Sequence, residues 1–160
     1  SLQLVVYQQA LQKMEAKDWN AAGLQLSQLI NANFSNKEAY VKRGIVHFQQ
    51  GEFAKAKADF DEAVKARVNT GELFEYRGNT RYKLEDFQGA AADLEKATGM
   101  GANAVETWAN LANAKFRLEN YKEAIGAYDK ALAQKPDAIL FNNRGKARYF
   151  LQDLPGAVAD

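Results

Sequence analysis

The sequence predicts an all-α protein built from repeated pairs of antiparallel helices. Three observations carry this prediction: residue types recur about every 34 residues, apolar residues within each half-repeat follow helical spacing, and only two prolines occur in 160 residues. A fixed period of this length is the signature of a solenoid. Because one helix pair cannot bury both of its faces, the pairs must stack. We therefore expect a solenoid of about four and a half repeats.

A column of small residues marks the first helix of each repeat. An alanine stands twelve residues after each small residue, and a large apolar residue stands four residues before it. We expect the small residue and the later alanine to face each other, so that the two helices cross closely. The small residues follow one another at spacings of 34, 34, 34 and 33, as Ala10, Gly44, Gly78, Ala112 and Gly145.

The expected helix pairs follow from these columns in chain order. Polar turn residues separate the two helices of each pair, and Asp18 and Asp86 can cap the helices that follow them. Pro155 suits the first turn of a helix, where a missing N–H costs little. The pairs are 2–16 with 18–32, 36–50 with 52–67, 71–84 with 86–98, 104–118 with 120–134, and 137–151 with 153–160. They form one array over 1–160, with repeats near 3–36, 37–70, 71–104, 105–137 and an incomplete 138–160.

Composition excludes several classes of function. The net charge is +1, without the basic excess of a nucleic-acid surface. The chain has no cysteine, and no apolar run approaches the roughly 18 residues of a membrane span. His47 is the only histidine, and no glycine-rich phosphate loop occurs. We expect no enzyme activity, no cofactor, no metal and no membrane insertion.

The sequence says less about the cellular compartment of the protein and about whether the chain is a fragment. No targeting segment is present, so we expect a soluble protein, with the cytoplasm favoured over the periplasm and the compartment left open. The chain begins with Ser1, and its fifth repeat stops at Asp160 inside the second helix. We therefore expect a fragment of a longer protein.

The repeat pattern resembles the tetratricopeptide repeat (TPR) family across nearly the whole chain. The second and third repeats match the family motif in their small, alanine and large apolar columns, while the first repeat is degenerate. The motif W-x2-L-G-x2-Y, then A-x3-F-x2-A and P, is met most fully by Trp108, Leu111, Ala112, Ala124, Tyr128, Ala131 and Pro136. The resemblance implies a right-handed superhelix whose first helices line a concave groove for protein or peptide partners.

The resemblance also assigns groove positions in this chain. They combine aromatic side chains with asparagine amides, which can donate to and accept from a peptide main chain. We therefore expect a non-catalytic scaffold that binds a partner segment in the groove. The expected peptide-binding residues are Val41, Lys42, Ile45, Phe48, Glu75, Tyr76, Asn79, Tyr82, Lys83, Asn110, Asn113, Phe116, Arg117, Asn142, Asn143, Lys146 and Tyr149.

Two other functions are compared with peptide binding, and end-to-end assembly is the one that stays open. The N-terminal stretch from Leu2 to Leu11 is unusually apolar and the last helix pair is incomplete, so copies could stack end to end as a homo-oligomer. Aromatic residues beside basic ones also suit single-stranded nucleic acid. Glu72, Glu75 and Glu106 would share the same groove, however, so we expect no nucleic-acid partner.

One subtype of the family clamps the C-terminal carboxylate of chaperone tails, and this chain departs from its pattern. Asn79 and Asn110 match, but Glu75 stands where the first lysine is needed. Ile139 and Asn143 replace the final lysine and arginine. An acidic residue would repel a carboxylate, so we do not expect a chaperone-tail clamp.

Comparison of the repeats with one another predicts structural ion pairs. Arginine precedes the small residue in the second, third and fifth repeats, and aspartate stands sixteen residues later in each. The first repeat has glutamine at both positions, and the fourth has leucine and alanine. Because the columns change together, we predict pairs within single repeats: Arg43 with Asp59, Arg77 with Asp93, and Arg144 with Asp160.

Overall fold

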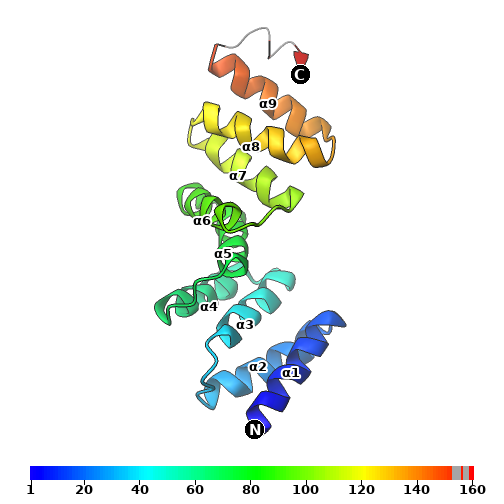
Figure 1. Cartoon of the computed structure of the whole chain (residues 1–160), viewed down its shortest axis with the longest axis vertical. Helices are drawn as coiled ribbons and strands as arrows, with labels where there is room; N and C mark the ends of the chain where they lie inside the picture. Colours follow the sequence, from blue (N-terminus) through cyan, green and yellow to red (C-terminus); the bar gives the residue numbers. More distant parts are fainter. Residues whose placement is uncertain (153–155, 157–158) are drawn as a thin grey trace.

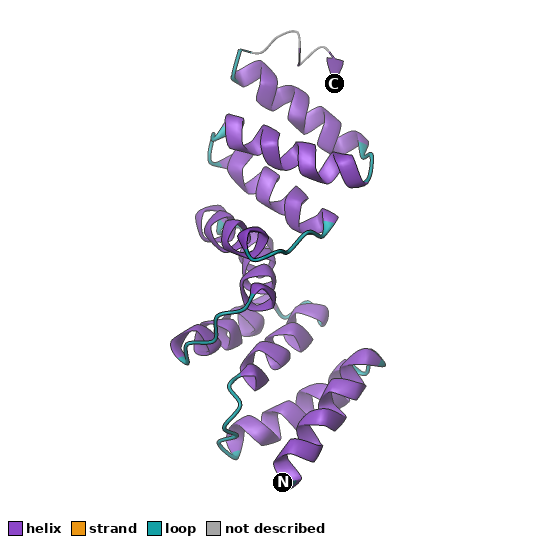
Figure 2. Ribbon diagram, in the orientation of Figure 1, coloured by secondary structure: helices purple, strands orange, loops and turns teal. Residues whose placement is uncertain are grey.

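A computed structural model describes residues 1–152, 156 and 159–160 of the chain. The described part contains nine α-helices and no strand (Figure 2). In chain order they are α1 (Leu2–Glu15), α2 (Trp19–Asn31), α3 (Glu38–Gln49), α4 (Phe53–Lys65), α5 (Gly71–Lys83), α6 (Phe87–Gly99), α7 (Val105–Arg117), α8 (Tyr121–Gln134) and α9 (Ala138–Phe150). The helices are stacked along one long axis, with the two chain ends at opposite ends of the stack (Figure 1).

The predicted all-α solenoid is confirmed, and each of these nine helices begins and ends within two residues of its expected bounds. The expected tenth helix at 153–160 lies largely outside the described residues. Asp18 and Asp86 cap α2 and α6 by accepting hydrogen bonds from the third backbone N–H of each helix. Glu52 and Asn120 form no side-chain cap of this kind.

One residue with a left-handed backbone connects the two helices of each pair. Only the second repeat uses glycine there, Gly51 at φ 76°. Lys17, Glu85 and Glu119 take φ values of 59° to 62° in the equivalent turns. The next backbone N–H then bonds back to the carbonyl five residues earlier, as from Asp18 to Lys13 at 2.9 Å. This turn reverses the chain at once and sets the two helices antiparallel.

The small-residue column makes room for a large side chain on the second helix. A Cβ atom added to Gly44 would lie 2.5 Å from the Phe60 ring, and one added to Gly78 would lie 2.7 Å from Leu94. The nearest neighbour is therefore the residue sixteen positions on, and not the alanine twelve positions on that the sequence suggested. The alanines Ala56 and Ala90 are fully buried in the same core.

The core runs as apolar clusters between successive helices. One lies between α1, α2 and α3, a second joins α3, α4 and α5, and a third extends from α6 to α9. Each helix pair thus completes its core with its neighbours, as expected for a solenoid. No helix in the described part of the chain is long and apolar enough to cross a membrane.

Candidate functional site

The first helices of the repeats carry three hollows on their surface. One of about 350 Å³ lies between α1, α3 and α5, and one of about 200 Å³ lies between α3, α5 and α7. Gln49 and Tyr76 line both of these hollows, which are therefore adjacent. A third, of about 820 Å³, lies along α9 beside Phe116 of α7. We call the surface formed by α1, α3, α5, α7 and α9 the groove.

Each of three aromatic rings in the groove packs against the aromatic ring of the first residue of the following helix. Phe48 packs edge-to-face on Phe53 with ring centres 5.5 Å apart. Tyr82 packs in the same way on Phe87 at 5.8 Å, and Phe116 does so on Tyr121 at 5.4 Å. Such pairs add to the stability gained from burial. They hold the half-buried groove rings in fixed orientations.

The asparagines of the groove bond largely to one another and to a buried tyrosine. Asn110 Nδ2 donates to Asn79 Oδ1 at 3.0 Å, and both residues are only 7% exposed. Asn113 Oδ1 accepts from the Tyr128 hydroxyl at 2.7 Å and from Asn143 Nδ2 at 3.4 Å. The two amide–amide bonds link neighbouring repeats, and the Tyr128 bond joins the two helices of the fourth repeat. Only some of the asparagine donors and acceptors therefore remain available to bond a ligand.

Two predicted apolar groove residues are buried in the structure. Val41 is 1% exposed and Ile45 is 5% exposed, and both belong to the core cluster around Phe60 and Leu73. Ile45 also lines the first hollow, whereas Val41 lines none of the three, so only Val41 lies wholly beneath the groove surface. Burial of this degree is usual for β-branched apolar residues.

Several of the other predicted residues line the hollows, while Tyr82, Asn110, Asn113 and Asn143 line none of the three. Lys42 and Tyr76 line the first hollow, Phe48, Glu75 and Asn79 line the second, and Asn142, Lys146 and Tyr149 line the third. Lys83 and Arg117 are exposed at the ends of α5 and α7. The structure adds lining residues that the sequence analysis did not name, among them Trp19, Thr107 and Phe150. Glu72 and Glu106, which the sequence analysis placed in the groove but not among the peptide-binding residues, line the first and second hollows.

Comparisons with known proteins agree with this architecture. One sequence model of the tetratricopeptide repeat matches residues 77–139, and a second matches residues 37–67, so that together they cover more than half of the chain. The chain belongs to the tetratricopeptide repeat family. This family and fold are typical of protein–protein interaction scaffolds. No curated protein sequence matches the chain.

Solved structures show the same TPR fold. The crystal structure of YrrB, described as a TPR protein with an unusual peptide-binding site, is 21% identical, with a TM-score of 0.84 over 96% of this chain and 80% of that one. A crystal structure of MamA is 19% identical, with a TM-score of 0.80 over 98% of this chain and 86% of that one. A point mutant of MamA is 15% identical, with a TM-score of 0.87 over 98% of this chain and 92% of that one.

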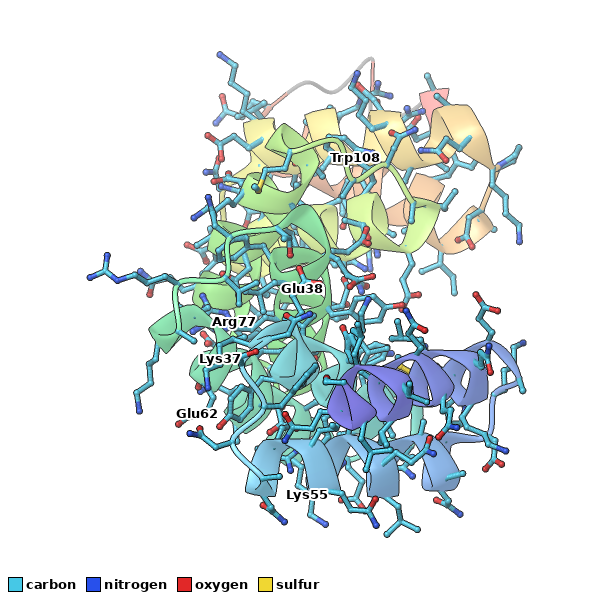
Figure 3. The ribbon with its side chains drawn as sticks, turned by 60° about the horizontal axis from the view of Figure 1, so that its bottom comes forward. Lys37, Glu38, Lys55, Glu62, Arg77 and Trp108 are labelled. Carbon is cyan, nitrogen blue, oxygen red and sulfur yellow. The ribbon has the colours of Figure 1, made fainter. Side chains whose placement is uncertain are left out.

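Buried arginine–aspartate pairs hold the TPR helices together, and one of them reaches the third hollow through Asp160. Arg43 donates to both Asp59 oxygens at 2.7 and 2.8 Å. Arg77, labelled in Figure 3, donates to Asp93 at 2.8 and 2.9 Å. Two-point bonding of this kind is the strong form of the ion pair. In the fifth repeat, Arg144 donates to Asp160 at 2.6 and 2.8 Å, and this bond lowers the pKa of the Asp160 carboxyl.

Each of these arginines also reaches back to the second helix of the preceding TPR repeat. Arg43 bonds Ser27 at 3.3 Å, and Arg77 bonds Asp61 at 3.2 Å. Arg144 bonds Asp129 at 2.7 Å. The prediction placed these pairs within single repeats only. The guanidinium group, which has five donors, therefore also joins adjacent repeats.

Carboxylates give the N-terminal half of the TPR groove a negative character. Burial raises the pKa of the Tyr76 hydroxyl, and Glu72 and Glu75 raise it further. Burial together with Glu38 and Glu72 raises the pKa of Tyr7 to about 12. Burial disfavours the tyrosinate anion most, and the nearby negative charges add to the same direction in both pKa shifts. Within the described residues, no group of three or more His, Asp or Glu side chains could hold a metal ion.

Proposed function

We propose that the groove of this TPR array binds an extended or helical segment of a protein partner without catalysing a reaction. The observation that carries this proposal is the row of hollows on the first helices, each lined by both aromatic and polar side chains. Sites of this composition combine apolar contact area with a few groups that fix orientation. The ring pairs behind Phe48, Tyr82 and Phe116 keep these aromatic surfaces in place before a ligand arrives.

The comparison with YrrB supports the same proposal. YrrB has this fold and is described as having a peptide-binding site. Its sequence identity to this chain is 21%, so the likeness concerns the arrangement of helices and not the ligand. The groove of this chain therefore has its own specificity, set by the side chains that line its hollows.

Replacement of two groove tyrosines tests the proposal. Tyr82 is half-buried and Tyr149 is 61% exposed, so Tyr82→Ala with Tyr149→Ala removes ring surface while leaving the fully buried core intact. Since aromatic residues dominate binding energy at interfaces, we expect partner proteins retained from a lysate to fall about tenfold or more. Quantitative mass spectrometry of the retained proteins measures this loss.

A matched control uses second helices. Leu24 on α2 and Lys130 on α8 are exposed, and neither lines the three groove hollows. The double variant Leu24→Ala with Lys130→Ala should retain the same partners as the unaltered protein. Equal losses in both double variants would contradict a role for the groove.

A second candidate function is end-to-end assembly of copies. Leu2 is 80% exposed and Leu4 is 49% exposed at one end of the stack, while Ile139 is 70% exposed and Phe150 is 54% exposed towards the other. Apolar side chains at both ends suit a head-to-tail contact, which can propagate from copy to copy. Size-exclusion chromatography over a concentration series separates the two candidates, because an array that stacks shifts to higher mass with concentration.

A further inference from the structure

The hollow between α3, α5 and α7 differs from its neighbours in its chemistry. It measures about 200 Å³ and is lined by two carboxylates, two aromatic rings and a buried amide, while no lysine or arginine lines it. The residues that give it this character are Phe48, Tyr76, Glu75, Glu106 and Asn79.

The two carboxylates of this hollow have no cationic partner among the described residues. The nearby Glu72 pairs with Lys42 at 2.8 Å and is thereby neutralised. Glu75 accepts a hydrogen bond from the Thr107 hydroxyl at 2.7 Å, which fixes its position without compensating its charge. Glu106 is exposed at the start of α7 and forms no ion pair with a described residue. Two negative charges therefore face one small space.

The aromatic walls suit a positive charge as well. Phe48 and Tyr76 meet edge-to-face, with ring centres 5.5 Å apart and ring planes at 86°. This geometry turns the faces of the two rings in different directions, and an aromatic face attracts a cation. Burial and the surrounding glutamates raise the pKa of the Tyr76 hydroxyl, which is consistent with a negative potential at this point.

A largely buried asparagine in the hollow keeps a free donor for a ligand. Asn79 lines the hollow and is only 7% exposed. Its Oδ1 atom accepts from Asn110, while its Nδ2 donor meets no acceptor among the described residues and is not one of the atoms shut off from solvent. The Nδ2 donor is therefore open to water or to a ligand in the hollow. A carbonyl oxygen of a bound main chain would supply the missing acceptor.

We propose that this hollow binds a lysine or arginine side chain of the partner segment, between Glu75 and Glu106 and against Phe48 and Tyr76, while Asn79 donates to an adjacent main-chain carbonyl. This inference rests on the proposed function, and it names the ligand class at one position of the groove. The third hollow, along α9, is lined by Lys146 and by no glutamate, so it does not suit a cation. The basic side chain would therefore enter the hollow between α3, α5 and α7 and not the one along α9, and this would fix the position of the segment along the groove.

Selection from a random twelve-residue peptide library tests this proposal. We expect the selected peptides to share one lysine or arginine. Replacing that residue in a selected peptide by norleucine for lysine, or by citrulline for arginine, removes the charge at nearly constant shape. Titration calorimetry should then show affinity lower by about tenfold or more, the loss expected for a charge-assisted bond.

Variants of the protein test whether Glu75 and Glu106 cause the preference for a charged peptide. Glu75→Gln with Glu106→Gln removes both charges, and glutamine at position 75 can still accept the bond from Thr107. We expect this variant to lose the preference for the charged peptide over its neutral analogue. The control Glu52→Gln with Glu62→Gln makes the same change of charge on exposed positions at α4 and should keep the preference. Thermal unfolding checks that all variants fold.

The outcomes separate this inference from the proposed function. Peptides that bind in competition with one another but show no basic residue would overturn the inference and leave a groove ligand in place. An undiminished preference for charge in the Glu75→Gln, Glu106→Gln variant would also overturn it. A library that yields no binding peptide would contradict the proposed function, and the inference would fall with it.

Discussion

Replacing Asp93 by alanine is expected to lower the free energy of unfolding by about 3–5 kcal/mol. The Asp93 side chain is 6% exposed and accepts bonds from Arg77 at 2.8 and 2.9 Å and from Arg81 at 3.0 Å. The two arginine side chains are only 12% and 20% exposed. Without the carboxylate, two largely buried cations lose their main partner while remaining poorly solvated. Urea unfolding followed by circular dichroism measures the loss.

Asp61 provides the matched control for this prediction. It belongs to the same network, since Arg77 Nη1 bonds it at 3.2 Å, but its side chain is 36% exposed. Asp61→Ala should cost about 0–1 kcal/mol, as exposed ion pairs usually do. Equal costs for the two variants would show that burial does not set the strength of this network.

Replacing Phe60 by alanine is expected to cost a similar amount, about 3–5 kcal/mol. Phe60 is fully buried, and its ring fills the space left open by the missing side chain of Gly44. Because α3 and α4 are also held by the Arg43–Asp59 pair, they cannot collapse fully into the vacated space. The same unfolding measurement applies, with Leu24→Ala at a 67% exposed position as the control that changes stability little.

The position of the damage distinguishes a solenoid from a globular core. Stability in a solenoid is largely a sum of repeats and nearest-neighbour contacts. Hydrogen exchange in the Phe60→Ala variant should therefore rise most in α3 and α4, then in α2 and α5, and least in α8 and α9. Uniform loss of protection along the chain would contradict a nearest-neighbour description.

Sequence reasoning reaches the fold because its signals are local and repeated. The spacing of Gly44 and Gly78 fixes the period, and helical spacing of apolar residues fixes each helix. Comparison of repeats also identified the partners Arg77 and Asp93 before any distance was known, since the two columns change together. Five copies of one unit serve here as an internal set of variants.

The sequence pattern does not predict how deeply a side chain is buried, nor which bonds it forms with the neighbouring repeat. Val41 lies on the same helix as groove residues, and only the packing of α4 and α5 decides that it is buried. The bond from Arg77 to Asp61 crosses between repeats, so it depends on the angle at which repeats stack. The bond between Asn79 and Asn110 depends on the same angle. Periodicity along one chain does not specify this angle.

Photo-crosslinking from defined positions tests the central claim, that partners bind in the groove, most directly. A photo-reactive amino acid replaces Tyr82 or Phe116 in the groove, or Lys55 or Glu62 on α4, whose side chains are 66% and 48% exposed. The last two are labelled in Figure 3. We predict that partner segments crosslink to positions 82 and 116 and not to positions 55 and 62. Crosslinks confined to the α4 positions, with the groove positions unreacted, would contradict the account.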